Sequence, residues 1–150
     1  MRVLLVISSL NDEENIDDCI RSAPVFTKDV IVVDMSSIYR TAEEVKSTGA
    51  ILNVISRARV VDPPRNYAFS LASGKWILLM DADECFTPKL RNKLCRIAVE
   101  NLADAVDVSF EVHMFGDIIL YSGWRFPARS AFLKDENEHL WQLQRQFSSV

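Results

Sequence analysis

The sequence is poor in cysteine and histidine, and this limits the kinds of site that it can form. Its three cysteines, Cys19, Cys85 and Cys95, do not follow the spacing of a metal site, and there are only two histidines. An odd number of scattered cysteines is typical of reduced thiols in a cytosolic protein, not of a disulfide scaffold or a zinc site. We therefore expect a fold held together by its core, which a chain of 150 residues is long enough to bury.

Long apolar runs and basic clusters are also missing. No apolar run approaches the roughly 20 residues of a membrane-spanning helix, so we expect a cytoplasmic protein whose membrane contact, if any, is peripheral and at the inner face. The short apolar run at residues 1–10 predicts a buried first strand and not a signal sequence. The net charge is −4, and nucleic-acid binding needs a concentrated basic surface. The sequence therefore argues against a nucleic-acid partner.

Short apolar runs alternate with amphipathic stretches through the first two-thirds of the chain. Apolar residues at helical spacing predict helices, whereas short continuous apolar runs predict strands that are buried on both faces. Their alternation predicts an α/β fold with a mostly parallel, Rossmann-like sheet flanked by helices. We expect strands at 2–8, 30–34, 51–55 and 76–80, and helices at 15–23, 41–48, 64–72 and 87–101.

The last third of the chain has a different pattern. Residues 106–114 and 118–121 alternate or run apolar on either side of a turn at residues 115–117. This pattern predicts a C-terminal β-hairpin at the edge of the sheet. There is no internal repeat and no linker, so we expect residues 1–150 to form a single domain.

Polar clusters follow three of the predicted strands, at residues 11–14, 34–37 and 81–84. Ligands of such sheets bind beyond the carboxyl ends of the strands. Asp81 and Asp83 would repel each other there unless a cation lies between them. Mg²⁺ binds to one or two carboxylates together with substrate phosphates, which implies a metal-bound diphosphate. The alternative is an exposed acidic turn that only caps the next helix.

Five segments together resemble family 2 glycosyltransferases with the GT-A fold. The segment 65–84 is similar to the RN-A-S-A-G-WIL-LDADE stretch of this family, and in particular of the branch typified by lipopolysaccharide-core glycosyltransferases. The similarity covers residues 3–134 in a consistent order. The other four matches are 11–15 with N-E-E-N, 34–41 with D-S-x-S-T-D-x-T, 49–50 with G-A, and 115–124 with F-G-x-x-I-x-x-G-G-W.

The resemblance implies which residues bind the nucleotide. The loop after the first strand lines the base pocket in the family, and here it carries Asn11 and Glu13. The aspartate that ends the second strand contacts the uracil or the ribose, and in this chain it is Asp34. The Arg-Asn pair at the start of the following helix corresponds to Arg65 and Asn66. An arginine at that place can bridge a carboxylate and a base edge or a diphosphate.

The resemblance also assigns the acidic pair and a residue on the acceptor side. Asp81 and Asp83 correspond to the metal–diphosphate site, and Asp83 is the expected direct metal ligand, because the second aspartate usually binds the ion in the family. Trp124 resembles the acceptor-side loop of the branch, where an aromatic face can stack on a sugar ring; core packing is an equal alternative. The implied cofactor is Mg²⁺ or Mn²⁺, and the implied donor is a UDP-sugar.

The sequence departs from the family pattern at the second strand and at the catalytic base. Tyr39 stands where the second-strand motif usually has an aspartate. An inverting transferase needs a carboxylate that takes the proton from the acceptor hydroxyl. The branch has an acidic residue after its Trp-x-Pro element, and this chain has Ala128 there. The later carboxylates are weak candidates for the base, and a solvated turn is their default interpretation: they are Asp135, Glu136 and Glu138.

The sequence thus predicts an inverting, metal-dependent glycosyltransferase. We expect it to transfer a sugar to a glycan or lipid-linked acceptor in cell-envelope or surface polysaccharide synthesis. Residues 1–104 would form the nucleotide-sugar-binding half and residues 105–150 part of the acceptor side. Relatives continue with further helices, so we expect a fragment, or a chain that takes the missing part from a partner chain.

Two alternatives remain open at this point. A non-catalytic nucleotide-sugar-binding or regulatory module would also explain Ala128 and Tyr39. A haloacid-dehalogenase-type phosphatase has a D-x-D motif as well, but at the end of its first strand. It also has Thr or Val where this chain has Cys85.

Overall fold

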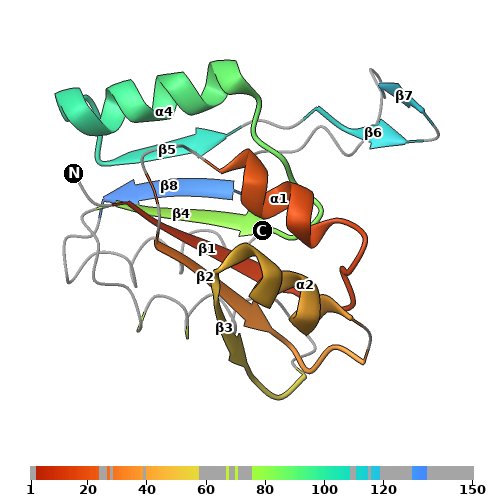
Figure 1. Cartoon of the computed structure of the whole chain (residues 1–150). Coiled ribbons are helices and arrows are strands. Elements are labelled where there is room, and N and C mark those ends of the chain that lie inside the picture. Colours follow the sequence, from red (N-terminus) through yellow and green to blue (C-terminus); the bar gives the residue numbers. More distant parts are fainter. Residues whose placement is uncertain are drawn as a thin grey trace, which may run out of the picture.

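The computed structural model describes residues 3–23, 27, 29–38, 40–57, 67, 70, 76–108, 111–114, 116–118 and 130–134 of the chain (Figure 1). Strands and helices alternate through its first part, as the apolar periodicity predicts. The elements are β1 (Val3–Ser9), α1 (Ile16–Ser22), β2 (Asp29–Asp34), α2 (Thr41–Thr48), β3 (Ile51–Val54), β4 (Trp76–Asp81), α4 (Pro88–Glu100), β5 (Ala105–Val108), β6 (His113–Met114), β7 (Asp117–Ile118) and β8 (Ser130–Lys134).

The main sheet has six strands in the order β3-β2-β1-β4-β8-β5. The first four are parallel to one another, and β8 runs antiparallel to both β4 and β5. The prediction of a mostly parallel α/β sheet is therefore confirmed. Both faces of β1 and β4 are covered, because successive side chains of each strand are buried in two clusters on opposite faces of the sheet, and this explains their continuous apolar sequences.

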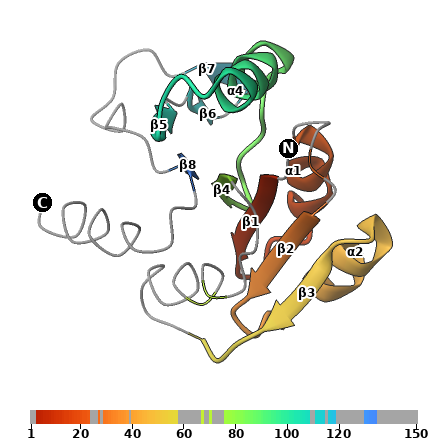
Figure 2. The same cartoon turned by 90° about the vertical axis from the view of Figure 1, so that its left-hand side faces the viewer.

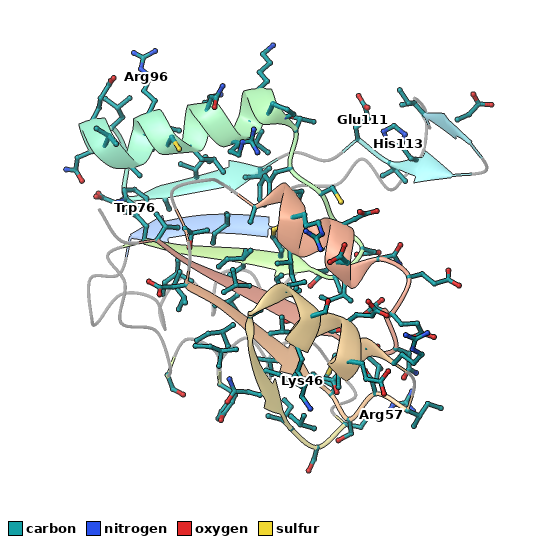
Figure 3. All side chains as sticks on the ribbon, viewed as in Figure 1. Lys46, Arg57, Trp76, Arg96, Glu111 and His113 are labelled. Atoms are coloured by element: carbon teal, nitrogen blue, oxygen red, sulfur yellow. The ribbon has the colours of Figure 1, made fainter. Side chains whose placement is uncertain are left out.

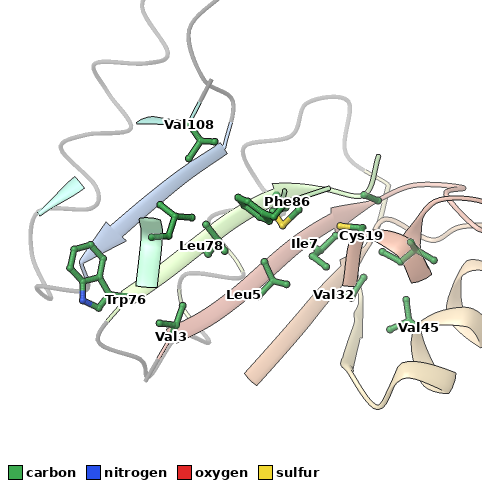
Figure 4. Close-up of a cluster of buried hydrophobic side chains, with 14 of the residues drawn as sticks. Val3, Leu5, Ile7, Cys19, Val32, Val45, Trp76, Leu78, Phe86 and Val108 are labelled. Atoms are coloured by element: carbon green, nitrogen blue, oxygen red, sulfur yellow. The ribbon is translucent and has the colours of Figure 1, made fainter. Parts of the chain in front are cut away.

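The core lies on both faces of this sheet. Side chains alternate along a strand, so Leu5 and Ile7 of β1 belong to one cluster and Leu4 and Val6 to the other. The larger cluster also takes in apolar residues of α1, α2 and α4, and these three helices lie together on one side of the sheet (Figure 2). Figure 4 shows Leu5 and Ile7 between β2 and β4 in this cluster. The predicted helix at 64–72 falls almost wholly outside the described residues.

The helix ends follow the chemistry of their flanking residues. The helix α2 ends at Gly49, whose φ of 81° lies in the left-handed region that glycine adopts without strain. The helix α4 begins after Thr87, whose Oγ1 accepts a hydrogen bond from the backbone N–H of Leu90 (3.2 Å), and Pro88 occupies its first turn. None of the described helices is long and apolar enough to cross a membrane.

Replacing Thr87 by alanine is expected to destabilise the protein by about 1 kcal/mol, because the substitution removes the side-chain cap of α4. Urea unfolding followed by circular dichroism measures the change. The Thr87→Ser variant keeps the hydroxyl and serves as the control. Equal losses in both variants would show that the cap contributes nothing.

The hairpin predicted at residues 106–114 and 118–121 does not lie at the edge of the main sheet, so its predicted place is wrong. The turn around Gly116 does join two antiparallel strands, but β6 and β7 form a separate two-stranded sheet with the pairs His113↔Ile118 and Met114↔Asp117. The strand β5 ends at Val108 and pairs with β8 instead. The alternating pattern of residues 106–114 therefore spans two strands, β5 and β6, that belong to different sheets.

Candidate functional site

The carboxyl ends of β1, β2 and β4 meet at one edge of the sheet. In the strand register, Ser9 at the end of β1 pairs with Asp34, and Ser8 pairs with Asp81. The two aspartates therefore flank the end of β1, as the polar clusters after the strands predict. By the alternation of side chains, Asp34 lies on the sheet face that α1 and α2 cover, and Asp81 lies on the opposite face.

Asp34 is almost fully enclosed, with 2% of its surface exposed. Oδ2 of its carboxylate accepts a hydrogen bond from the backbone N–H of Ser37 (2.9 Å), and Oδ1 accepts one from the Ser37 hydroxyl. Its backbone carbonyl accepts from the N–H of Ile55 (2.8 Å), just after β3. The second loop, residues 35–38, is thus tied to its own strand and to the neighbouring one.

The first loop, residues 10–14, is also held by side-chain bonds. Oδ2 of Asp12 accepts from the backbone N–H of Leu10 (2.8 Å) and from the hydroxyl of Ser9 (3.2 Å). Glu13 is half-buried, and its Oε2 is buried without a hydrogen-bond partner among the described residues. A buried acceptor without a partner is costly, which sets Glu13 apart from the bonded side chains of this loop.

The acidic turn, residues 81–84, is anchored in the core through its second residue. Ala82 is 3% exposed, and its N–H donates to the carbonyl of Ser8 at the end of β1 (3.2 Å). The turn is closed by the N–H of Glu84, which donates to the Asp81 carbonyl (3.1 Å), while Oε2 of Glu84 accepts from the Asp81 N–H (3.0 Å). Asp83 is exposed and accepts no hydrogen bond from the part of the chain that the structure describes. The turn therefore presents the Asp83 carboxylate to solvent.

Two side chains of α1 bond to the backbone of the acidic turn and of the segment after it. The sequence does not predict these contacts. Cys19 is fully buried, and its Sγ donates to the Asp81 carbonyl (3.6 Å). Burial, together with the nearby Cys85 and the acidic turn, raises the pKa of the Cys19 thiol above its ordinary value, so the group stays protonated and can donate. The hydroxyl of Ser22 accepts from the N–H of Phe86 (2.9 Å). The helical spacing of Cys19 indicates a core position but not this bond, because its partner lies 62 residues away.

Arg57 is a second residue that the sequence interpretation misses. It lies in the segment that follows β3. The second loop is bonded to this segment, because the Ser36 hydroxyl donates to the Ile55 carbonyl (2.7 Å). Arg57 is exposed and forms no ion pair within the described ranges, and Figure 3 shows its position. Arg40, by contrast, pairs with Glu43 (3.2 Å). Arg57 thus places an exposed positive charge just after the end of β3.

The oxygen ligands of the acidic turn fit a hard divalent cation. Mg²⁺ and similar ions take carboxylate oxygens and often only one or two of them from the protein. No group of three or more His, Cys, Asp or Glu that could hold a metal comes together in the part of the chain that the structure describes. An ion at Asp81 and Asp83 would therefore need further ligands, such as phosphate oxygens or water.

The remaining predicted site residues lie outside the described residues, so their positions stay untested. The histidine His113 is described, and its Nε2 contacts Oε1 of Glu111 (3.0 Å) on the separate hairpin, where both side chains are exposed (Figure 3). Within the described ranges it forms no bond to the acidic turn. The predicted residues outside the described ranges are Arg65, Asn66, Trp124, Asp135, Glu136 and Glu138.

Comparison with known proteins identifies related sequences and structures. The sequence model described as Glycosyl transferase family 2 matches residues 4–148. The structure of S. aureus TarS 1-349 has a TM-score of 0.63 at 21% identity and covers 70% of this chain and 34% of its own. The same protein in complex with UDP-GlcNAc has a TM-score of 0.60 at 21% identity, with 70% and 33% covered. Glucosyl-3-phosphoglycerate synthase from Mycobacterium tuberculosis, with Mn²⁺, UDP-glucose and phosphoglyceric acid, has a TM-score of 0.48 at 19% identity, with 53% and 32% covered. The chain spans about a third of the length of these proteins.

Proposed function

Because the chain belongs to glycosyl transferase family 2, we propose that it binds a UDP-sugar at the carboxyl edge of its sheet and takes part in an inverting sugar transfer. The observation that carries this proposal is the acidic turn, which is anchored by Ala82 and presents Asp83 beside the end of β1. Family membership also removes the phosphatase alternative. The TarS structure, which shares the fold, holds UDP-GlcNAc, and this supports a UDP-linked donor.

The acidic turn is proposed to hold the diphosphate of the donor through a divalent cation. A bound Mg²⁺ or Mn²⁺ would neutralise the charge that develops on the departing diphosphate. Asp83 would be the direct ligand, since it is exposed, and Asp81 would assist it. Cys19 and Glu84 hold the backbone of Asp81 from two sides, at its carbonyl and at its N–H. This fixes the turn before any ligand arrives.

The nucleotide is proposed to lie between the first and second loops. Glu13 supports this placement, because its buried Oε2 lacks a partner in the described part of the chain and can accept from the base or the ribose. Asn11 lies beside it in the same loop. Arg57 adds a positive charge on the β3 side of the second loop, and Arg65 and Asn66 keep the roles that the family resemblance implies.

Transfer itself rests on residues of the second half of the chain. Asp135, Glu136 and Glu138 are the candidates for the base that deprotonates the acceptor, and Trp124 is the candidate for acceptor contact. Residues 1–104 are proposed to form the donor half, and residues 105–150 part of the acceptor side. The proposed acceptor is a glycan or lipid-linked sugar of the cell envelope, as in the lipopolysaccharide-core branch, reached from the cytoplasmic face of the membrane.

A second candidate is a module that binds a nucleotide-sugar without transferring it. Ala128 favours it, because the branch has an acidic residue at that position, and Tyr39 favours it as a departure in the second loop. In this case a partner chain would supply the catalytic residues. The donor site would be the same in both candidates.

Calorimetric titration with UDP, with Mn²⁺ and then with EDTA, tests the donor site. We expect Mn²⁺ to tighten UDP binding by at least about tenfold, which corresponds to roughly 1.4 kcal/mol. An assay of UDP-sugar hydrolysis then separates the candidates, since turnover supports the transferase and binding without turnover supports the module. If UDP does not bind at all, the proposal is wrong.

A further inference from the structure

Ser37 connects the two loops between which the nucleotide is proposed to lie. Its hydroxyl accepts a hydrogen bond from the backbone N–H of Asn11 (2.8 Å) and donates one to Oδ1 of Asp34. Its own N–H donates to Oδ2 of the same carboxylate (2.9 Å). The hydroxyl therefore uses its one donor and one of its two acceptor sites. It joins the end of β2 to the loop after β1.

A second bond between the loops runs beside the first. Oδ1 of Asn11 accepts from the backbone N–H of Ile38 (3.0 Å), a residue 27 positions further along the chain. Asn11 has a φ of 60°, in the left-handed region, which asparagine adopts more readily than most residues. Its backbone N–H and its side-chain carbonyl thus both bond to the second loop. The two loops are held as one unit.

Asp34 has little access to a ligand in this arrangement. Only 2% of its surface is exposed, and each of its carboxylate oxygens already accepts a bond from Ser37. Asp34 is thus placed to act on the nucleotide through Ser37, the residue that it holds. We propose that Ser37 is a positioning residue of the donor site, which keeps Asn11 and the second loop in the arrangement that binds the nucleotide. This inference rests on the proposed function.

Loss of the Ser37 hydroxyl would leave two polar groups without their partner. The N–H of Asn11 would lose its acceptor, and Oδ1 of the buried Asp34 would lose its donor. Polar groups without a partner favour other loop conformations, in which they form hydrogen bonds with water or with other residues. The apparent affinity for a ligand falls in proportion to the fraction of molecules that keep the binding arrangement.

Titration with UDP in the presence of Mn²⁺, by calorimetry on the whole chain, tests the inference. For Ser37→Ala we expect the Kd to rise about tenfold. Ser37→Thr retains a hydroxyl and is expected to restore most of the affinity. Ser47→Ala is the matched control, because the exposed Ser47 hydroxyl bonds to the Glu44 carbonyl within α2 and to neither loop. It should bind UDP within about twofold of the wild type. Urea unfolding of each variant ensures that the titrations are made on folded protein.

The outcomes separate this inference from the proposed function. Failure of the wild type to bind UDP overturns both, whereas an unchanged Kd for Ser37→Ala overturns the positioning role alone. If Ser37→Ala does not fold, Ser37→Cys decides. The thiol has nearly the shape of the hydroxyl but is a weak donor and a weak acceptor, so it weakens the bonds to the Asn11 N–H and to Asp34. We expect its Kd to rise at least about threefold, and an unchanged Kd contradicts the inference.

Discussion

The Asp83→Asn variant is expected to lose most of the Mn²⁺ dependence of UDP binding while it keeps its fold. Asparagine has the shape of aspartate but no charge, so it is a weak ligand for a hard cation. Asp83 is exposed and accepts no hydrogen bond from the described residues, so its removal leaves no buried group without a partner. In calorimetric titrations the Kd for UDP with Mn²⁺ should rise by at least about tenfold, towards the value measured in EDTA.

Asp117→Asn provides the matched control for this experiment. Asp117 is exposed on β7, in the separate hairpin, and the substitution changes the net charge by the same amount. It should leave the Kd for UDP unchanged, and both variants should unfold within about 0.5 kcal/mol of the wild type. Wild-type affinity of Asp83→Asn for UDP in Mn²⁺ would contradict the assignment of Asp83 as the metal ligand.

The Leu5→Ala variant should lose about 2–5 kcal/mol of stability. Leu5 is completely buried in β1, where it pairs with Val30 of β2 and with Leu78 of β4. Truncation of its side chain leaves a cavity that neighbouring strands cannot close without breaking the sheet. Because small proteins are stable by only about 5–15 kcal/mol, the loss is a large part of the total. Urea unfolding measures it.

Ile51→Ala tests whether this cost comes from burial. Ile51 lies on the edge strand β3 and is 58% exposed, although it is also an aliphatic strand residue. Its truncation should cost less than about 1 kcal/mol. Equal costs for the two variants would mean that Leu5 does not lie in the centre of the core.

The first four strands could be predicted because each is a short apolar run that can be recognised in the local sequence, even the exposed edge strand β3. The strand β8 could not. It pairs antiparallel with β4 and β5, so Phe132 matches Leu78 on one side and Val106 on the other. Such pairing between distant segments leaves no local periodicity in the sequence. The same reason explains the misplaced hairpin, since nothing in residues 105–108 indicates that they pair with β8.

The expectation that ligands bind beyond the carboxyl ends of the strands located the candidate site. It did not predict the hydrogen bonds that fix the loops of the site. Asp34 and Asp81 lie where the ends of β2 and β4 meet β1, as expected. That Ser37 occupies both oxygens of Asp34, and that Cys19 bonds to the Asp81 carbonyl, could not be read from the sequence. These contacts depend on the backbone course of the loops and on the packing of α1.

The burial of Ala82 has a consequence for the energetics of ligand binding. Its side chain is part of the core and its N–H bonds to β1, so the backbone of the acidic turn loses its conformational freedom when the protein folds. A cation that binds to the turn then has little ordering left to impose, and more of the interaction energy remains as affinity. Mutations that loosen the core beneath Ala82 would therefore weaken binding of the ion without touching either aspartate.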